Sequence, residues 1–189
     1  MAQVRKDDIK ERIFDAALEE FYEKDFKTAT MRGIALRAKI PAGLIYTYYQ
    51  NKQTLFDQIV ETVLCRLPKT LLNTVTKGGI PFDRAASMDK VFALQLFEHR
   101  RALILLTDKS KGTGHQHAKE NIIRMIEEYI KASLSSRNGR SYDDLLPHIL
   151  AGNYFESLLE ILRHYQSRAW AEEMLDLVTK QFFEGCNAL

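Results

Sequence analysis

The most informative stretch of the sequence is AKIPAGLIYTYYQNKQTLF, residues 38–56. It gathers three tyrosines around Thr47 and carries no acidic residue. Ile40-Pro41 ends any helix that comes before it, because proline does not fit a helix interior. We therefore expect a new, short helix over residues 42–49.

The faces of this short helix follow from helical geometry. Residues advance by about 100° each, so residues four apart share one stripe. Ile45 and Tyr49 form such a stripe, and we assign it to the core because Ile45 is the most apolar centre available. Thr47 then points outward, and Tyr46 and Tyr48 fall on opposite flanks. The predicted outer face is small and uncharged, with one hydroxyl-tipped ring on each side.

A second short helix is predicted directly upstream, over residues 31–38, with Thr30 as its N-cap. Two short helices joined by a tight turn are typical of a helix-turn-helix, in which the second helix enters the DNA major groove. Flanking tyrosine hydroxyls can bond phosphates while outward residues approach base edges. A carboxylate there would meet phosphate, which explains the missing acids. The alternative is that Tyr46 and Tyr48 are core aromatics.

Charge is distributed unevenly, although the formal net charge is only +2. From Lys24 to Lys52 the single acid is Asp25, and the basic residues are Lys24, Lys27, Arg32, Arg37, Lys39 and Lys52. Such a local basic patch indicates a face directed at an anion. A simple solvated face is the alternative, and charge alone does not separate the two.

The rest of the chain predicts an all-α fold. Apolar residues recur at three and four over residues 9–21, after which residues 24–29 form a connector. A fourth helix leads up to Pro68, further helical stretches cover residues 91–106 and 122–130, and two long apolar helices occupy about 145–166 and 169–184. No segment predicts a strand. We expect a helix-turn-helix domain over residues 1–52 and a helical domain over residues 53–189.

Composition excludes several classes of protein. The 189 residues are 46% hydrophobic and 28% charged, which suits a soluble chain. No signal peptide or membrane-spanning run is present, so we predict a cytoplasmic protein with no membrane partner. Cys65 and Cys186 fit no metal or redox spacing. His115 and His117 near Glu120 are expected to be incidental loop histidines. No phosphate loop or nucleophile motif appears, so we predict no enzyme activity, cofactor or metal.

The sequence TMRGIALRAKIPAGLIYTYYQNKQTLF, residues 30–56, resembles the DNA-binding signature of the TetR family of transcriptional regulators. The order of residues matches from the Thr30 cap to Leu55-Phe56. The resemblance implies an N-terminal three-helix DNA-binding domain and a C-terminal domain for effector binding and dimerisation. It also implies a homodimer, usually a repressor, that releases operator DNA when a small molecule binds.

Matched by position, the resemblance implies one set of phosphate contacts and one set of base-facing residues. The phosphate set is Thr30, Tyr46, Tyr48 and Lys52, and the base-facing set is Ala42, Gly43, Leu44 and Thr47. Pro41 and Ala42 depart from the family pattern, because a side-chain cap and a polar contact are usual there. Lys39 replaces the usual turn glycine, so a residue with a Cβ is expected in the left-handed region.

The C-terminal domain gives weaker indications. The last two helices are predicted to form the dimer interface as a four-helix bundle, through Leu158, Leu159, Ile161, Leu162 and Tyr165 with Trp170, Met174, Val178 and Phe182. Both could instead be ordinary core helices. The residues proposed for a pocket that takes a largely apolar effector are Phe92, Met125, Tyr129 and Asn153. A helical small-molecule-binding or scaffold protein that has lost DNA binding is the alternative function.

Overall fold

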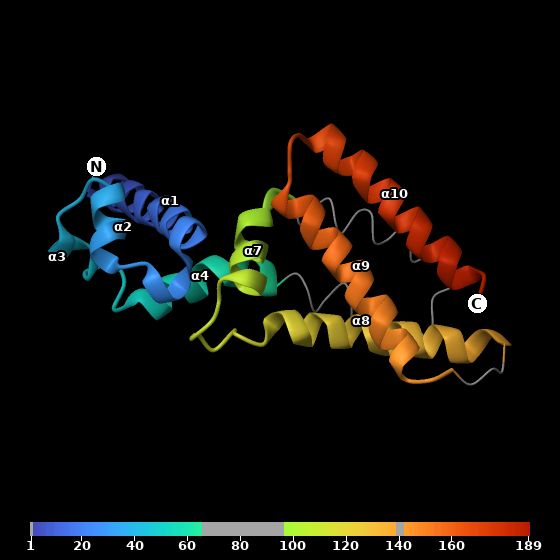
Figure 1. The fold of residues 1–189 in the computed structure, drawn as a ribbon. Helices are drawn as coiled ribbons and strands as arrows, with labels where there is room; N and C mark the ends of the chain where they lie inside the picture. Colours follow the sequence, from blue (N-terminus) through green and yellow to red (C-terminus); the bar gives the residue numbers. More distant parts are fainter. Residues whose placement is uncertain (1, 66–96, 139–141) are drawn as a thin grey trace. The chain divides into compact units, whose positions relative to one another are not determined.

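The computed structural model describes residues 2–65, 97–138 and 142–189. Every regular element within these ranges is a helix, and no strand occurs there, as the periodicity predicted. The helices are α1 (Ala2–Thr28), α2 (Met31–Arg37), α3 (Ala42–Ile45), α4 (Lys52–Leu64), α7 (Arg100–Asp108), α8 (Ala118–Asn138), α9 (Leu145–Arg163) and α10 (Arg168–Asn187) (Figure 1).

These helices form two compact units. The first contains the described residues up to Leu64 together with Arg101–Ala118. The second contains the described residues of Cys65–Arg100 and Lys119–Leu189. The boundary predicted from the sequence, after residue 52, lies at the first residue of α4 and therefore inside the first unit.

Helix α1 continues through residues that the sequence predicted to be a connector. Its helical path is interrupted at Asp25, where φ is 68° and ψ is 172°. The Asp25 carboxylate accepts a hydrogen bond from the Thr28 amide at 2.9 Å, as an N-cap does. The Phe26 amide donates to the carbonyl of Lys109 at 3.1 Å. The kink therefore directs one backbone donor out of α1 toward the segment after α7.

The core of the first unit is apolar and aromatic. Phe21, Phe26 and Phe56 pack against one another with ring centroids 5.1–6.0 Å apart. The fully buried large side chains of this unit come from five helices, and they are Ile13, Phe21, Ile34, Ile45, Leu55, Phe56, Ile59, Leu103, Leu105 and Leu106. The burial of these side chains stabilises the short helices α2 and α3, which would not be stable alone.

The second unit is built from α8, α9 and α10. Tyr154 on α9 stacks on Phe182 of α10, with ring centroids 4.2 Å apart. Glu156 on α9 accepts a hydrogen bond from Lys119 of α8 at 2.6 Å and another from Arg163. Pro147 lies in the first turn of α9, where its missing N–H is tolerated. The proline therefore does not interrupt α9, which begins at Leu145 as predicted.

Candidate nucleic-acid interface

The N-terminus of α2 is capped as the sequence predicted. The Thr30 hydroxyl accepts a hydrogen bond from the Gly33 amide at 3.0 Å, and the Thr30 carbonyl accepts from Ile34. Thr30 is itself exposed, so its side chain is accessible from the solvent. Gly33 lies directly against the buried carboxylate of Glu20 on α1.

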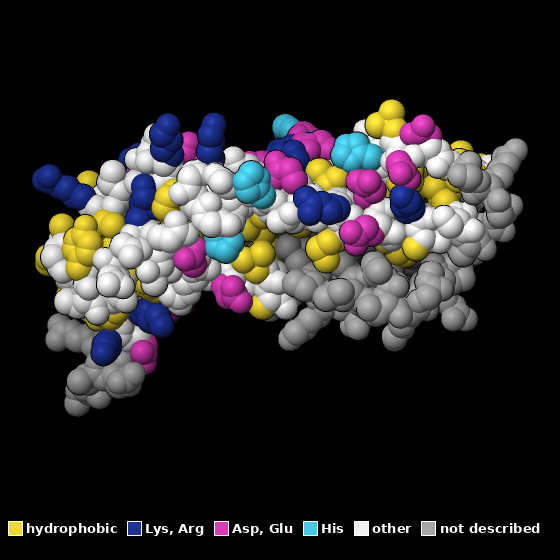
Figure 2. All heavy atoms as spheres, turned by 90° about the horizontal axis from the view of Figure 1, so that it is seen from below, with side chains coloured by type: hydrophobic (Ala, Val, Ile, Leu, Met, Phe, Trp, Pro, Cys, Tyr) yellow, Lys and Arg dark blue, Asp and Glu magenta, His cyan; other side chains and the backbone are white. Residues whose placement is uncertain are grey.

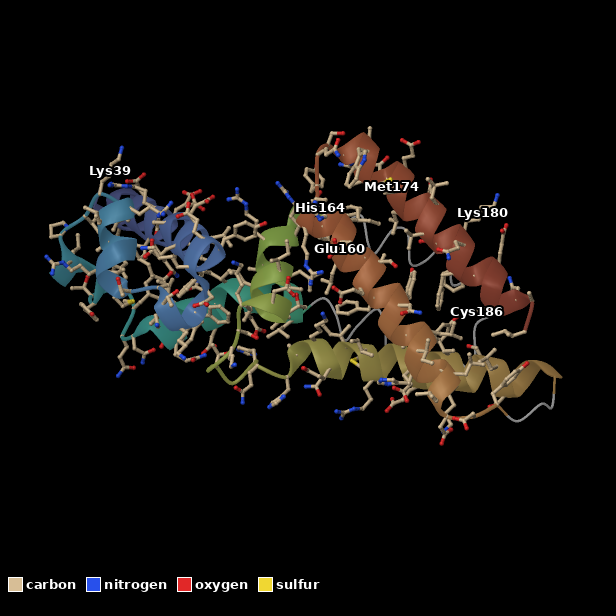
Figure 3. The ribbon with its side chains drawn as sticks, in the orientation of Figure 1. Lys39, Glu160, His164, Met174, Lys180 and Cys186 are labelled. Carbon is tan, nitrogen blue, oxygen red and sulfur yellow. The ribbon has the colours of Figure 1, made fainter. Side chains whose placement is uncertain are left out.

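The turn between α2 and α3 contains the left-handed residue expected at Lys39, whose φ is 55°. Its carbonyl and that of Ala38 accept hydrogen bonds from the Arg12 guanidinium at 3.2 and 2.6 Å. Arg12 thereby satisfies carbonyls that the end of α2 leaves without helical partners. The Lys39 side chain points away from the helices into solvent (Figure 3).

Helix α3 is shorter than the predicted range of residues 42–49, because it ends at Ile45. The following residues form tight turns, in which the Thr47 amide bonds the Leu44 carbonyl and the Tyr48 amide bonds the Ile45 carbonyl. The Thr47 hydroxyl donates to the same Leu44 carbonyl at 2.7 Å, and such local bonds compete with regular helix. Pro41 provides no side-chain cap, as expected.

The inward and outward faces of α3 and its following turn agree with the helical geometry. Ile45 and Tyr49 are buried, whereas Thr47 is exposed and Tyr46 keeps 56% of its surface exposed. Tyr48 is half-buried. Of the other base-facing candidates, Ala42 and Gly43 are exposed and Leu44 is half-buried. Apolar packing thus fixes one side and leaves an uncharged side accessible.

Tyr49 has a feature that the sequence did not indicate. Its hydroxyl is buried and has no hydrogen-bond partner among the described residues. Burial raises the pKa of Tyr49 above its ordinary value, since desolvation disfavours the phenolate. The residue therefore acts as core packing and not as a polar contact.

The basic patch predicted from residues 24–52 is partly neutralised within the protein. Lys24 pairs with Glu20 at 2.9 Å, and Arg37 pairs with Glu23 at 2.5 Å and Glu20 at 3.5 Å. The hydrogen bond from Arg37 lowers the pKa of Glu23. Three of the six basic residues in this patch have exposed side chains that form no hydrogen bond or ion pair with the described part of the chain. They are Lys27, Arg32 and Lys39.

Lys52 also bonds within the protein. Its ammonium donates to the carbonyls of Phe26 at 2.6 Å, Ala29 at 2.9 Å and Lys27 at 3.4 Å, and it lies 4.5 Å from the centre of the Phe26 ring. The predicted role as a phosphate contact did not include these partners. Sequence reasoning could not find them, because the carbonyls belong to a connector more than twenty residues away.

The surface in Figure 2 is consistent with a limited basic face. Several Lys and Arg side chains stand out on the visible side of the N-terminal unit, where few acidic side chains show. On the visible side of the C-terminal unit, acidic and histidine side chains lie among the basic ones.

Comparison with known proteins agrees with this geometry. Residues 13–59 match the family model described as bacterial regulatory proteins, tetR family. These residues carry the N-terminal DNA-binding domain of the TetR family of transcriptional regulators. The matched residues include most of α1, all of α2 and α3, and the first part of α4.

Two relatives and one solved structure show how far the similarity extends. The HTH-type transcriptional regulator YhgD of Bacillus subtilis (strain 168) is 27% identical over 130 residues, which are 69% of this chain and 67% of that protein. The HTH-type transcriptional repressor DhaR of Mycobacterium sp. (strain GP1) is 17% identical over 76% of this chain and 75% of its own. The crystal structure of AibR in complex with isovaleryl coenzyme A and operator DNA has a TM-score of 0.67 at 19% identity, covering 93% and 98% of the two chains.

The structure does not bring the candidate pocket residues together. Phe92 lies outside the described residues. Met125 and Tyr129 lie one turn apart on α8, with Met125 half-buried and Tyr129 buried. Asn153 is exposed on α9, so its amide does not need a protein partner.

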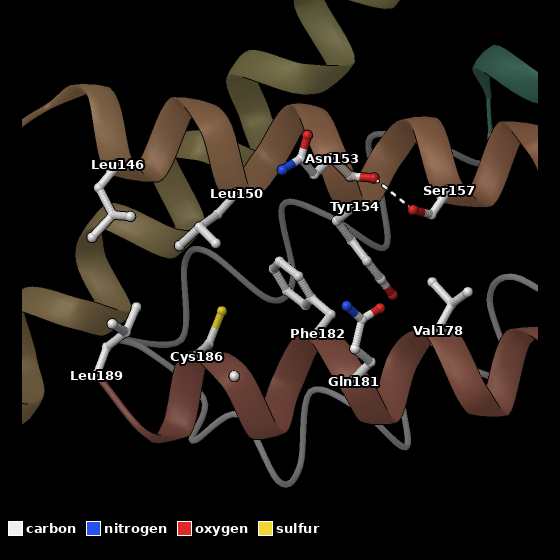
Figure 4. A pocket seen from close by; sticks show the side chains of 11 residues that line it. Leu146, Leu150, Asn153, Tyr154, Ser157, Val178, Gln181, Phe182, Cys186 and Leu189 are labelled. Carbon is white, nitrogen blue, oxygen red and sulfur yellow. Dashed lines mark hydrogen bonds between the residues drawn. The ribbon is translucent and has the colours of Figure 1, made fainter.

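A groove between α9 and α10 includes Asn153 (Figure 4). Its volume is about 360 Å³. Apolar side chains and uncharged polar ones line it, namely Leu146, Leu150, Asn153, Tyr154, Ser157, Val178, Gln181, Phe182, Cys186 and Leu189, with Gly185. The Ser157 hydroxyl donates to the Asn153 carbonyl at 2.8 Å, so it belongs to the wall of the groove.

The residues predicted for the dimer interface divide into two groups. Leu159, Ile161 and Leu162 are buried inside the subunit, where they serve the core. The half-buried ones are Leu158, Tyr165, Trp170, Met174, Val178 and Phe182. Sequence periodicity missed the more exposed apolar residues, which are Leu145, Ile149 and Leu177. Leu145 and Ile149 stand one turn apart on α9, so they share one face of that helix.

The histidine loop after α7 has a structural role. His115 lies 2.9 Å from the Asp57 carboxylate of α4, so it is not an incidental surface residue. His117 is exposed. Within the described ranges, no three His, Cys, Asp or Glu side chains come together as a metal-binding group. None of the helices described in residues 2–65, 97–138 and 142–189 combines the length and apolar character that crossing a bilayer requires.

Proposed function

We propose that this TetR-family regulator is a ligand-responsive repressor that binds operator DNA as a homodimer. The observation that carries the DNA-binding part is the accessible side of α3 and its following turn. There Thr47 is exposed between Tyr46 and Tyr48, opposite the buried Ile45 and Tyr49. An acid-free, uncharged surface of this kind can approach base edges in the major groove.

Each candidate contact has a chemical role in this proposal. Ala42, Gly43, Leu44 and Thr47 face the bases, where Leu44 and the Thr47 methyl suit a thymine methyl. Tyr46, Tyr48 and the Thr30 hydroxyl bond phosphates on either side and fix the register. The thin set of polar base contacts implies that sequence preference rests largely on apolar contacts with thymine. Gly43 leaves open space, since a Cβ there would meet nothing within 4 Å.

The direct test is fluorescence anisotropy with the DNA upstream of the protein's own gene and a shuffled duplex of equal length. We expect tighter binding to the upstream DNA. Thr47→Ala should reduce this preference, because it removes the methyl and hydroxyl without disturbing the buried Ile45 and Tyr49. Equal affinity for both duplexes would exclude a sequence-specific operator and favour a helical binding or scaffold protein that has lost DNA recognition.

The homodimer is proposed to form through α9 and α10. Leu145, Ile149 and Leu177 are exposed beside the half-buried residues of the groove, and a second copy can cover this surface as a four-helix bundle. A two-fold dimer places two recognition helices on successive major grooves and favours a near-palindromic operator. Sedimentation velocity at micromolar concentration tests the assembly, and a monomer that still binds the operator would contradict it.

The effector is proposed to bind within residues 53–189, on the side of α8 that carries Met125 and Tyr129. A flexible thioether and a buried aromatic ring suit a largely apolar molecule. The solved complex of AibR with isovaleryl coenzyme A and operator DNA supports a small organic effector for this fold. A ligand can release DNA only if it binds the non-binding conformation more tightly.

A thermal-shift screen of apolar and aromatic compounds tests the effector proposal. Compounds that stabilise the protein should also weaken operator binding. Hits that leave operator affinity unchanged count against repression relieved by a ligand. DNA binding is proposed for residues 1–52 and effector binding for residues 53–189. No stabilising compound should therefore contact the first 52 residues, which chemical-shift mapping can test.

A further inference from the structure

The guanidinium of Arg12 on α1 lies against the turn between α2 and α3. Its Nη2 atom donates to the carbonyl of Ala38 at 2.6 Å and to the carbonyl of Lys39 at 3.2 Å, and its Nη1 atom lies 3.8 Å from the Asp8 carboxylate. The two carbonyls belong to the peptide groups on either side of the Lys39 Cα. Because φ and ψ of a residue are the rotations between its flanking peptide planes, one nitrogen holds both planes of Lys39.

The conformation that Arg12 holds is unfavourable for lysine. φ at Lys39 is 55°, in the left-handed region where a Cβ crowds the following carbonyl oxygen. Asp25 also has a positive φ, but its own carboxylate bonds the nearby Thr28 amide. The Lys39 side chain forms no such bond with the described part of the chain. Its backbone conformation therefore needs support from another residue.

Bonds within the turn give part of this support. The Ile40 amide donates to the Ala35 carbonyl at 3.0 Å and the Lys39 amide donates to the Leu36 carbonyl at 3.1 Å. This is the pattern of a Schellman motif, with Lys39 as its left-handed residue. Both bonds end at carbonyls of α2, so neither uses the two carbonyls that face Arg12.

Arg12 differs from the other polar ties between α1 and α2. Arg37 pairs with Glu23 at 2.5 Å and with Glu20 at 3.5 Å, and these ion pairs hold the last turn of α2. The bonds from Arg12 reach past the end of α2 to the turn from which α3 starts. The direction of α3 depends on the two backbone angles at Lys39, so Arg12 acts on the orientation of the recognition surface.

We infer that Arg12 is a positioning residue for operator recognition, which holds Lys39 in the left-handed conformation that orients α3. This inference rests on the proposed operator binding. In this role Arg12 touches neither base nor phosphate, so its loss lowers the fraction of protein in which α3 is correctly oriented. The apparent affinity for DNA falls in proportion to that fraction.

The test compares Arg12→Met with Arg124→Met in the full-length chain. Both variants lose one guanidinium, but Arg124 is exposed on α8 and forms no hydrogen bond or ion pair with the described part of the protein. Each protein is titrated at several salt concentrations with the DNA upstream of its own gene and with a shuffled duplex. The slope of log K against log salt then reports how many phosphates the protein neutralises.

For Arg12→Met we expect affinity for the upstream DNA to fall about tenfold at every salt concentration, because the penalty of the left-handed region for a residue with a Cβ corresponds to about that change in population. The salt slope should not change, and Arg124→Met should bind like the unchanged protein. A slope flattened by about 0.9 in Arg12→Met would show a phosphate contact and would overturn the inference.

The variant Lys39→Gly separates positioning from general stability. Glycine adopts positive φ readily, so the turn should keep its conformation without Arg12. Added to Lys39→Gly, Arg12→Met should weaken binding to the upstream DNA by less than about threefold. Equal losses in both backgrounds, or unchanged affinity of folded Arg12→Met, would overturn the positioning role.

An NMR measurement distinguishes failure of this inference from failure of the proposed function. A residue with positive φ gives a strong intraresidue nuclear Overhauser effect between its amide and Hα protons, because these protons lie close together. The signal of Lys39 should weaken in Arg12→Met and persist in Arg124→Met. An unchanged signal in Arg12→Met would overturn the inference. If the unchanged protein does not bind the upstream DNA, the proposed function fails, and this signal still decides whether Arg12 holds the turn.

Discussion

Glu20 fills the space beside Gly33: a Cβ on Gly33 would lie 2.3 Å from the Glu20 Oε1 atom. Glu20 is only 2% exposed, and Lys24 and Arg37 hold its carboxylate at 2.9 and 3.5 Å. The carboxylate cannot move without weakening these ion pairs inside the protein. A glycine is therefore required on α2 by a buried charge on α1.

Gly33→Ala should lower the free energy of unfolding by about 2 kcal/mol, the range expected when a packed site is overfilled. Urea denaturation measures this change. Gly43→Ala is the matched control, because nothing lies within 4 Å of its added Cβ and alanine is the better helix former. Equal stability of the two variants would show that Glu20 moves aside freely.

Lys39→Gly should raise the free energy of unfolding by about 1 kcal/mol, because φ at Lys39 is 55° and a Cβ is disfavoured in the left-handed region. Thermal unfolding measures the gain. Lys39→Ala is the control, since it removes the same side chain but keeps the Cβ. If both variants gain equally, the lysine side chain and not the backbone conformation is responsible.

Particular residues show which of these features a sequence can predict. Thr30, Ile45, Tyr49 and Lys39 were placed correctly because their environments depend on capping, helical period and turn geometry, which are local. The early end of α3 was missed, because the Thr47 hydroxyl bond to Leu44 competes with the helix that periodicity favours. Local rules therefore predict orientation better than length.

Long-range partners were not predictable. Nothing near Lys52 in the sequence indicates that carbonyls at 26–29 surround it, and nothing near Glu20 indicates Gly33. In the last two helices, apolar spacing could not separate Leu159, which is buried within the subunit, from Leu177, which is exposed. Both lie on apolar helices, and only packing decides which side each faces.

Tyr49→Phe should leave the free energy of unfolding unchanged or raise it by up to about 1 kcal/mol, because the buried hydroxyl has no partner among the described residues. Operator affinity should not change. Tyr46→Phe is the matched control. The exposed Tyr46 hydroxyl is a proposed phosphate contact, so its removal should weaken operator binding without changing the free energy of unfolding. A destabilised Tyr49→Phe would reveal a bonded hydroxyl.

Glu156 should contribute to the loss of stability in acid. Hydrogen bonds from Arg163 and then Lys119 lower its pKa below the ordinary 4.5. A carboxyl group with a lowered folded-state pKa stabilises the protein above its unfolded pKa and loses that contribution as the pH falls through the folded value. Glu156→Gln should therefore flatten the fall in thermal midpoint below about pH 4.5.

Glu173→Gln on α10, an exposed residue, is the control. A parallel acid profile for Glu156→Gln would contradict the assignment.

Leu177→Glu should convert the proposed dimer into monomers. Leu177 on α10 is 56% exposed, and Ile149 on α9 is 45% exposed. A charge buried in an apolar interface without a partner costs several kcal/mol, and two-fold symmetry introduces it twice. Sedimentation velocity at micromolar concentration should show a monomer for Leu177→Glu and for Ile149→Glu. Leu36→Glu on α2 is the control, since Leu36 is 80% exposed but lies in the other unit. It should remain dimeric.

A monomeric variant should also bind a single operator half-site with unchanged preference but lose most of its affinity for the full operator. Dimers that persist in both the Leu177 and Ile149 variants would place the interface elsewhere.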